Sequence, residues 1–219
     1  ACYDAALRYE RGQSAVTNIE EAVRLLQFSC DKQYYRSCVK LGYYHLEGKG
    51  VTQNEEKAYQ YYSTACSNDN MKGCHALGLM YAEGRYVNQD LGKAIQFLSQ
   101  ACDAGEGVAC GATALLLRLQ SPPDLDKSLI YCQKGCALGN LDSCAQEAYI
   151  FTQPPRLDMK QAAHLFKTYC SQNHAKSCYN YAIMLYQGQG VEQDQNLSFS
   201  VMKQACTLGD QEACQSIGQ

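Results

Sequence analysis

Cysteines are the residues whose spacing says most about the chemistry of this chain, which has 14 of them among 219 residues. Twelve form pairs whose members stand eight positions apart. The pairs are Cys30 and Cys38, Cys66 and Cys74, Cys102 and Cys110, Cys136 and Cys144, Cys170 and Cys178, and Cys206 and Cys214. Zinc sites generally use tighter C-x2-C or C-x4-C pairs, which do not occur here. The spacing therefore favours disulfides over a metal site.

Serines with a lysine three positions later could supply a nucleophile for acyl transfer. The S-x-x-K matches are Ser29 with Lys32, Ser37 with Lys40, and Ser200 with Lys203. About one such match is expected by chance, and the sequence contains no K-T-G or G-x-S-x-G motif beside them. We interpret these residues as parts of helix surfaces and assign no catalytic residue.

Histidines and the two unpaired cysteines also offer little catalytic chemistry. His45, His75, His164 and His174 are scattered, and no C-x-x-C-H haem motif is present, so we predict neither metal nor cofactor. Cys2 and Cys132 have no partner at the common spacing and are predicted free thiols. Cys132 could form a C-x3-C redox pair with Cys136, but other repeats carry a mostly large apolar residue at its position, which favours a buried thiol.

A repeat positions the cysteine pairs. The first cysteines recur every 34 or 36 residues, a period typical of stacked helical hairpins. Cys2 lies 36 positions before Cys38, so we expect the chain to begin within a repeat.

Each repeat is predicted to contain two helices. Asn or Asp stands twelve residues before each first cysteine and is a suitable helix N-cap. Small residues eight positions before that cysteine and large apolar ones four before it share one helix face. A seven-residue turn would follow, with Gly105, Gly139, Asn173 and Gly209 in the left-handed conformation.

The second helix is predicted to start near the second cysteine and to run for about twelve residues. A small residue always stands four positions after this cysteine, which indicates close approach of a neighbouring helix. We expect these helices to end at Gly12, Gly48, Gly84 and Gly188.

This turn explains how the paired cysteines meet. On one continuous helix they would be about 12 Å apart, at about 1.5 Å per residue. A disulfide requires Cα atoms within about 4.4 to 6.8 Å. A helix that ends at the first cysteine and another that starts at the second would bring the pair together.

The stretches "KLGYYHLEGKGVTQNEEKAYQYYSTAC" and "ALGLMYAEGRYVNQDLGKAIQFLSQAC" resemble Sel1-like repeats, which are related to tetratricopeptide repeats. With its C-x7-C pairs, the chain is similar to the Helicobacter cysteine-rich protein family. The resemblance implies an all-α, right-handed α/α solenoid with disulfide-closed hairpins, exported from a bacterium. We predict one domain over residues 1–219 with about six repeats, whose second cysteines stand at 2, 38, 74, 110, 144, 178 and 214. Shortened loops are expected near 121–124 and 153–156, where "SPPD" and "QPPR" replace the glycine loop.

Charge and hydropathy narrow the partners and the compartment. A net charge of −3 and a pI near 5.8 do not favour nucleic acid, and no apolar run is long enough to insert into a membrane. Reliance on disulfides predicts an oxidising compartment, either secreted or periplasmic or, as an alternative, the mitochondrial intermembrane space. If the chain is exported, we expect its signal segment to have been removed already.

In the related tetratricopeptide repeats the first helix lines a concave face, and the repeat register transfers this face to specific residues. The predicted groove residues are Tyr3, Arg36, Tyr43, Lys72, His75, Leu79, Leu115, Tyr149, Lys176, Tyr179, Ile183 and Tyr186. Tyrosines mixed with cations suit a protein or an extended peptide, although many tyrosines could instead pack between repeats. We predict an exported, non-catalytic binding or adaptor module. The alternatives that the resemblance implies are a weak β-lactamase or a protein that binds penicillin or peptidoglycan peptides, and a mitochondrial assembly factor.

Overall fold

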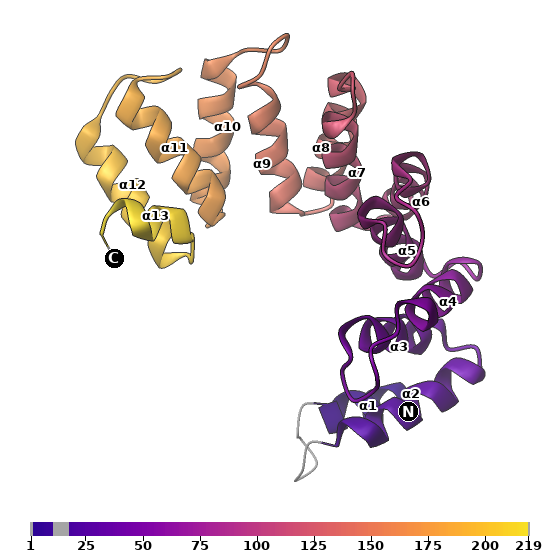
Figure 1. The fold of residues 1–219 in the computed structure, drawn as a ribbon. Coiled ribbons are helices and arrows are strands. Elements are labelled where there is room, and N and C mark those ends of the chain that lie inside the picture. The colour runs from indigo at the N-terminus through magenta and orange to yellow at the C-terminus, as the bar shows by residue number, and fades with distance from the viewer. Residues whose placement is uncertain (1, 11–17, 219) are drawn as a thin grey trace. The chain divides into compact units, whose positions relative to one another are not determined.

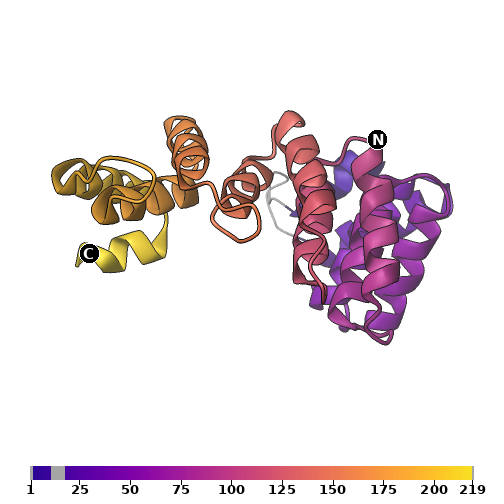
Figure 2. The same ribbon diagram turned by 90° about the horizontal axis from the view of Figure 1, so that it is seen from above.

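A computed structural model describes residues 2–10 and 18–218, which form thirteen helices and no strands. The chain divides into two compact units, unit 1 (Ala1–Glu106) and unit 2 (Gly107–Gln219). Within each unit successive helices lie side by side (Figures 1 and 2). The predicted all-α hairpin architecture is confirmed. A single domain over residues 1–219 stays a prediction.

The helix bounds follow the repeat. Unit 1 contains α1 (Cys2–Glu10), α2 (Ile19–Asp31), α3 (Tyr35–Glu47), α4 (Glu55–Cys66), α5 (Met71–Glu83) and α6 (Leu91–Asp103). Unit 2 contains α7 (Gly107–Leu119), α8 (Leu125–Ala137), α9 (Leu141–Ile150), α10 (Met159–Ser171), α11 (Ala175–Gln187), α12 (Gln195–Thr207) and α13 (Gln211–Ser216). None of the described helices is long and apolar enough to cross a membrane.

The predicted N-caps of the even-numbered helices are confirmed. Each Asn or Asp accepts a hydrogen bond from the backbone N–H three residues later, at N···O distances of 2.8 to 3.0 Å. These caps are Asn18, Asn54, Asp90, Asp124, Asp158 and Asp194. They satisfy amides that the first helical turn leaves open and so fix where each helix starts.

The turns within the hairpins are shorter than predicted. Each odd-numbered helix after α1 starts three residues before its cysteine, so three or four residues separate the helices rather than seven. In α5, α9, α11 and α13 this start is fixed by a second set of N-caps four positions before the second cysteine, at Asn70, Asn140, His174 and Asp210. The N-cap of α3, Tyr34, makes no side-chain hydrogen bond. The predicted left-handed residues lie as expected, with φ between 63° and 98° at Gly105, Gly139, Asn173 and Gly209.

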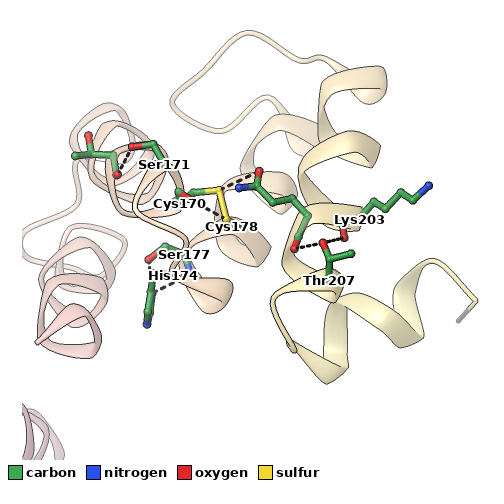
Figure 3. The surroundings of a disulfide bond; sticks show 9 residues. Cys170, Ser171, His174, Ser177, Cys178, Lys203 and Thr207 are labelled. Atoms are coloured by element: carbon green, nitrogen blue, oxygen red, sulfur yellow. Dashed lines mark hydrogen bonds between the residues drawn. A yellow bond between two sulfur atoms is a disulfide. The ribbon is translucent and has the colours of Figure 1, made fainter.

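Five cysteine pairs join the two helices of a hairpin, with Cα–Cα distances of 4.5 to 4.9 Å. Cys102 and Cys110 are each disulfide-bonded as well. Figure 3 shows one of these bridges, between Cys170 on α10 and Cys178 on α11. Cys2 and Cys132 are the cysteines outside disulfides in the part of the chain that is described.

Small residues allow close helix packing, as the sequence predicts. A Cβ added to Gly42 would lie 2.5 Å from Cε1 of Tyr62, and one on Gly78 would lie 2.7 Å from Cγ of Leu98. These contacts join α3 to α4 and α5 to α6. Helices α3, α5 and α11 end at the left-handed Gly48, Gly84 and Gly188, whereas Gly12 lies outside the described residues.

Cys132 occupies a core position. Its side chain is fully buried, like those of Leu26 and Leu98 at the same place in their repeats. Burial is the main cause that raises the pKa of its thiol, to about 12. A buried, protonated thiol acts as a small apolar side chain, so the interpretation as packing is favoured over a redox role.

Candidate functional site

A cavity of about 450 Å³ in unit 1 is lined by Tyr3, Arg36, Val39, Lys40, Tyr43, Asn70 and Lys72. We call it the unit 1 groove. Tyr3, Arg36, Tyr43 and Lys72 are four of the twelve predicted groove residues, and the structure brings them together. They come from α1, α3 and α5, which are the same helix in three successive repeats.

Tyrosine rings form part of this surface. Tyr43 is 45% exposed, so its ring is accessible from solvent. The ring of Tyr3 packs against that of Tyr34, with centroids 5.4 Å apart. Partial burial raises the pKa of the Tyr3 phenol above its ordinary value, so this hydroxyl remains a hydrogen-bond donor at neutral pH.

Lys40 is held in place at the side of the groove. Its Nζ lies 3.0 Å from a carboxylate oxygen of Glu10 and 5.6 Å from the ring centroid of Tyr43. Lys49 approaches the same carboxylate at 2.7 Å. Burial alone would raise the pKa of Glu10, but hydrogen bonds from Lys49 and Lys40 outweigh it and lower the pKa. Glu10 therefore stays ionised and fixes Lys40.

Sequence reasoning missed three lining residues. Val39 stands at the same register position as Tyr3, so the repeat register already pointed to it. Lys40 and Asn70 lie at positions outside the transferred register. The signal for Asn70 was its place as an N-cap of α5, which the expected seven-residue turn concealed.

The two other predicted residues of unit 1 do not line the groove. His75 is half-buried, and burial lowers its pKa. Leu79 is 36% exposed on the same helix.

The predicted residues of unit 2 are divided among separate contacts. Arg118 lies 4.8 Å from the ring centroid of Tyr149, and Leu115 nearby in sequence is exposed. Lys176 Nζ lies 4.7 Å from the ring centroid of Tyr179. Ile183 and Tyr186 line another cavity, of about 580 Å³, with Phe199, Met202 and Ile217 among its other residues. We call this the unit 2 cavity.

Two of the three serines of the S-x-x-K matches, Ser29 and Ser37, are engaged in local packing. Ser37 is buried and its hydroxyl donates a hydrogen bond to Ser29 Oγ, at 2.9 Å, beside the Cys30–Cys38 bridge. Lys40, the lysine of that match, is bound to Glu10 instead. Ser200 is exposed on α12.

Two histidines have structural contacts. His174 caps α11: its Nδ1 lies 2.8 Å from Ser177 Oγ (Figure 3), and its Nε2 lies 3.1 Å from Asp142 Oδ1. His45 is buried and stacks on Tyr61, with ring centroids 5.6 Å apart.

Comparison with known proteins supports the prediction of Sel1-like repeats. The family model described as Sel1 repeat matches residues 1–34, 36–70, 72–106, 112–140 and 175–210. A comparison with the curated proteins gives no match.

Solved structures with similar folds come from several bacteria. A protective antigen of uropathogenic Escherichia coli is 21% identical, with a TM-score of 0.84. The match covers 97% of this chain and 46% of the other, so this chain spans about half the length of that protein. A Sel1 repeat protein from Oxalobacter formigenes is 18% identical, with a TM-score of 0.83, over 94% and 86% of the two chains. Helicobacter pylori cysteine rich protein B is 27% identical over 57% of this chain and 93% of the other, with a TM-score of 0.47.

Proposed function

The chain belongs to the Sel1 repeat family, and on this premise we propose that it is a non-catalytic module that binds a protein or an extended peptide in the unit 1 groove. Sel1 repeat proteins generally mediate protein interactions. The observation that carries the proposal is the convergence of Tyr3, Arg36, Tyr43 and Lys72 on one cavity. Residues from three repeats meet there, as a chain laid across successive helices requires.

The residue types that line the unit 1 groove suit a peptide ligand. Tyrosine supplies a large contact area at low entropic cost and keeps a polar tip, so it suits main-chain and side-chain contacts alike. Asn70 adds an amide, and the cations add charge-assisted hydrogen bonds. A cavity of about 450 Å³ accommodates a few side chains of such a segment.

The disulfides suggest an oxidising compartment. We propose export from a bacterial cell as the route to it, in line with the bacterial sources of the similar structures. Expression in the periplasm of a bacterial host, followed by non-reducing peptide mapping, should recover the bridges and leave Cys2 and Cys132 open to alkylation after denaturation.

Selection from a random 12-residue peptide library displayed on phage tests the binding proposal. We expect peptides that bind the oxidised protein and lose about tenfold or more in affinity with Tyr43→Ala, since truncating an aromatic anchor typically has this effect. Tyr86→Ala is the matched control, because Tyr86 is 51% exposed in unit 1 and does not line the groove. Selected peptides that bind Tyr43→Ala as well as the wild type would overturn the unit 1 groove as the site.

A further inference from the structure

The position two residues before the second cysteine distinguishes the two units. In unit 1 it carries Arg36 and Lys72, which are both cations and both exposed. In unit 2 it carries Val108, Asp142, Lys176 and Glu212. The repeat register therefore places like charges in unit 1 and mixed charges in unit 2.

Unit 2 neutralises its charges at this position internally. Lys176 Nζ lies 2.9 Å from Glu212 Oε2, and the hydrogen bond and charge of Lys176 lower the pKa of that carboxyl. Asp142 Oδ1 lies 3.1 Å from Nε2 of His174. A ligand carboxylate would have to displace Glu212 to reach Lys176.

Unit 1 leaves its cations available. Within the described ranges 2–10 and 18–218, no ion pair joins Arg36 or Lys72 to another residue. Lys40 and Lys49 share the single carboxylate of Glu10, so this cluster also carries excess positive charge. With Asp4 and Glu106 counted beside Glu10, four cations stand near three carboxylates in a chain whose net charge is −3.

We propose that the unit 1 groove selects acidic peptide segments, with Arg36 and Lys72 binding their carboxylates and Tyr3 and Tyr43 contacting the intervening chain. This inference rests on the proposed function and adds the class of ligand to it. A guanidinium and an ammonium without internal partners gain charge-assisted hydrogen bonds on binding a carboxylate, and they lose no existing ion pair. A peptide is favoured over a nucleic acid because the excess charge is local, whereas the whole chain repels a long polyanion.

Fluorescence anisotropy with four fluorescein-labelled probes tests the inference on the full, oxidised chain. The probes are the peptides (Glu-Ala)5, (Gln-Ala)5 and (Lys-Ala)5 and the oligonucleotide (dT)10. We expect (Glu-Ala)5 to bind about tenfold more tightly than (Gln-Ala)5 at low salt and to lose most of this advantage above about 0.2 M NaCl, because exposed ion pairs are screened. (Lys-Ala)5 is expected to bind least.

Variants then locate the site. Arg36→Gln and Lys72→Gln should each weaken (Glu-Ala)5 binding about fivefold to tenfold, and Arg36→Lys should retain most of it because the charge remains. Lys176→Gln is the matched control, since it makes the same change at the same register position in unit 2 and should leave binding unchanged.

The outcomes separate this inference from the proposed function. Equal binding of (Glu-Ala)5 and (Gln-Ala)5, or equal losses in Lys72→Gln and Lys176→Gln, would overturn the acidic specificity. Library peptides without carboxylates that still require Tyr43 would overturn it while leaving the peptide-binding function intact. Tighter binding of (dT)10 than of (Glu-Ala)5 would assign the groove to a polyphosphate ligand instead and contradict the proposal.

Discussion

Units 1 and 2 share their hairpin frame and differ in the charge that the frame presents. Both use N-capped helices, left-handed turn residues and cysteine bridges in one register. Among the described residues no ion pair joins Arg36 or Lys72 of unit 1, whereas Lys176 of unit 2 is paired with Glu212. Positions that build the frame are therefore constrained by packing, and positions on the exposed helix face remain free to define a ligand.

Removing one disulfide should lower the free energy of unfolding equally in the two units. Removing one bridge from unit 1 with Cys66→Ala and Cys74→Ala should reduce the free energy of unfolding by about 2 to 3 kcal/mol, because each bridge closes a loop of similar length. Cys170→Ala with Cys178→Ala should have the same effect in unit 2. Guanidinium unfolding followed by circular dichroism measures both. A loss confined to one unit would show that the frames are not equivalent.

The position four residues after the second cysteine should differ between the units in its tolerance of a methyl group. Gly42→Ala places a methyl group against Tyr62, and we expect a net loss of about 1 to 2 kcal/mol after the gain in helix propensity. Unit 2 has Ala182 at this register position, with Met202 in place of Tyr62. Adding Tyr62→Met to Gly42→Ala should therefore recover stability in a thermal melt. If the double variant is no more stable than Gly42→Ala, the Tyr62 ring is not the cause.

Acid should weaken unit 1 through His45. Burial has the largest effect on His45 and lowers its pKa. A hydrogen bond with the backbone of Thr52 raises this pKa, and the positive charge of Lys57 lowers it. The unfolded chain therefore binds a proton more readily than the native one, so this contribution to stability is complete above the ordinary pKa near 6.5 and decreases as the pH falls below it.

His45→Leu tests this reading, because Leu117 and Leu185 fill the same register position in unit 2. We expect the urea midpoint to fall less between pH 7.5 and 5.5 in the variant than in the wild type. His75 remains in both proteins and also has a pKa lowered by burial, so part of the pH dependence should persist. His164→Leu, at an exposed site, is the control for the replacement of a histidine by leucine.

The smallest effect should come from making unit 2 resemble unit 1. Glu212→Gln releases Lys176 from its ion pair and should improve binding of (Glu-Ala)5 by less than about fivefold, as expected for one exposed charge. The added binding should disappear in the double variant with Lys176→Gln. An unchanged affinity in Glu212→Gln would show that a free cation at this register position is insufficient without the tyrosines of the unit 1 groove.

The cysteine spacing and the N-caps made most of the fold predictable. A pair eight positions apart could be bridged only across a turn, and Asn54 or Asp90 fixes a helix start through local hydrogen bonds. The length of the turn was predicted less well. Asn70 and His174 were not recognised as caps, because a histidine is an uncommon cap and because the second helix was expected to start at the cysteine itself.

The candidate site was only partly predictable. Register identified Tyr3, Arg36, Tyr43 and Lys72, because side chains at equivalent positions of stacked helices share a face. It could not indicate that Lys176 is paired with Glu212 or that Glu10 holds Lys40, since both contacts join residues distant in sequence.

The sequence by itself determined the helices, their caps and the bridges that join them, because these depend on interactions between residues close along the chain. Only the tertiary structure decided which of the exposed charges are neutralised and which tyrosines and cations surround one cavity. Ion pairing and cavity shape depend on side chains from different repeats meeting in space, and periodicity alone does not specify these contacts.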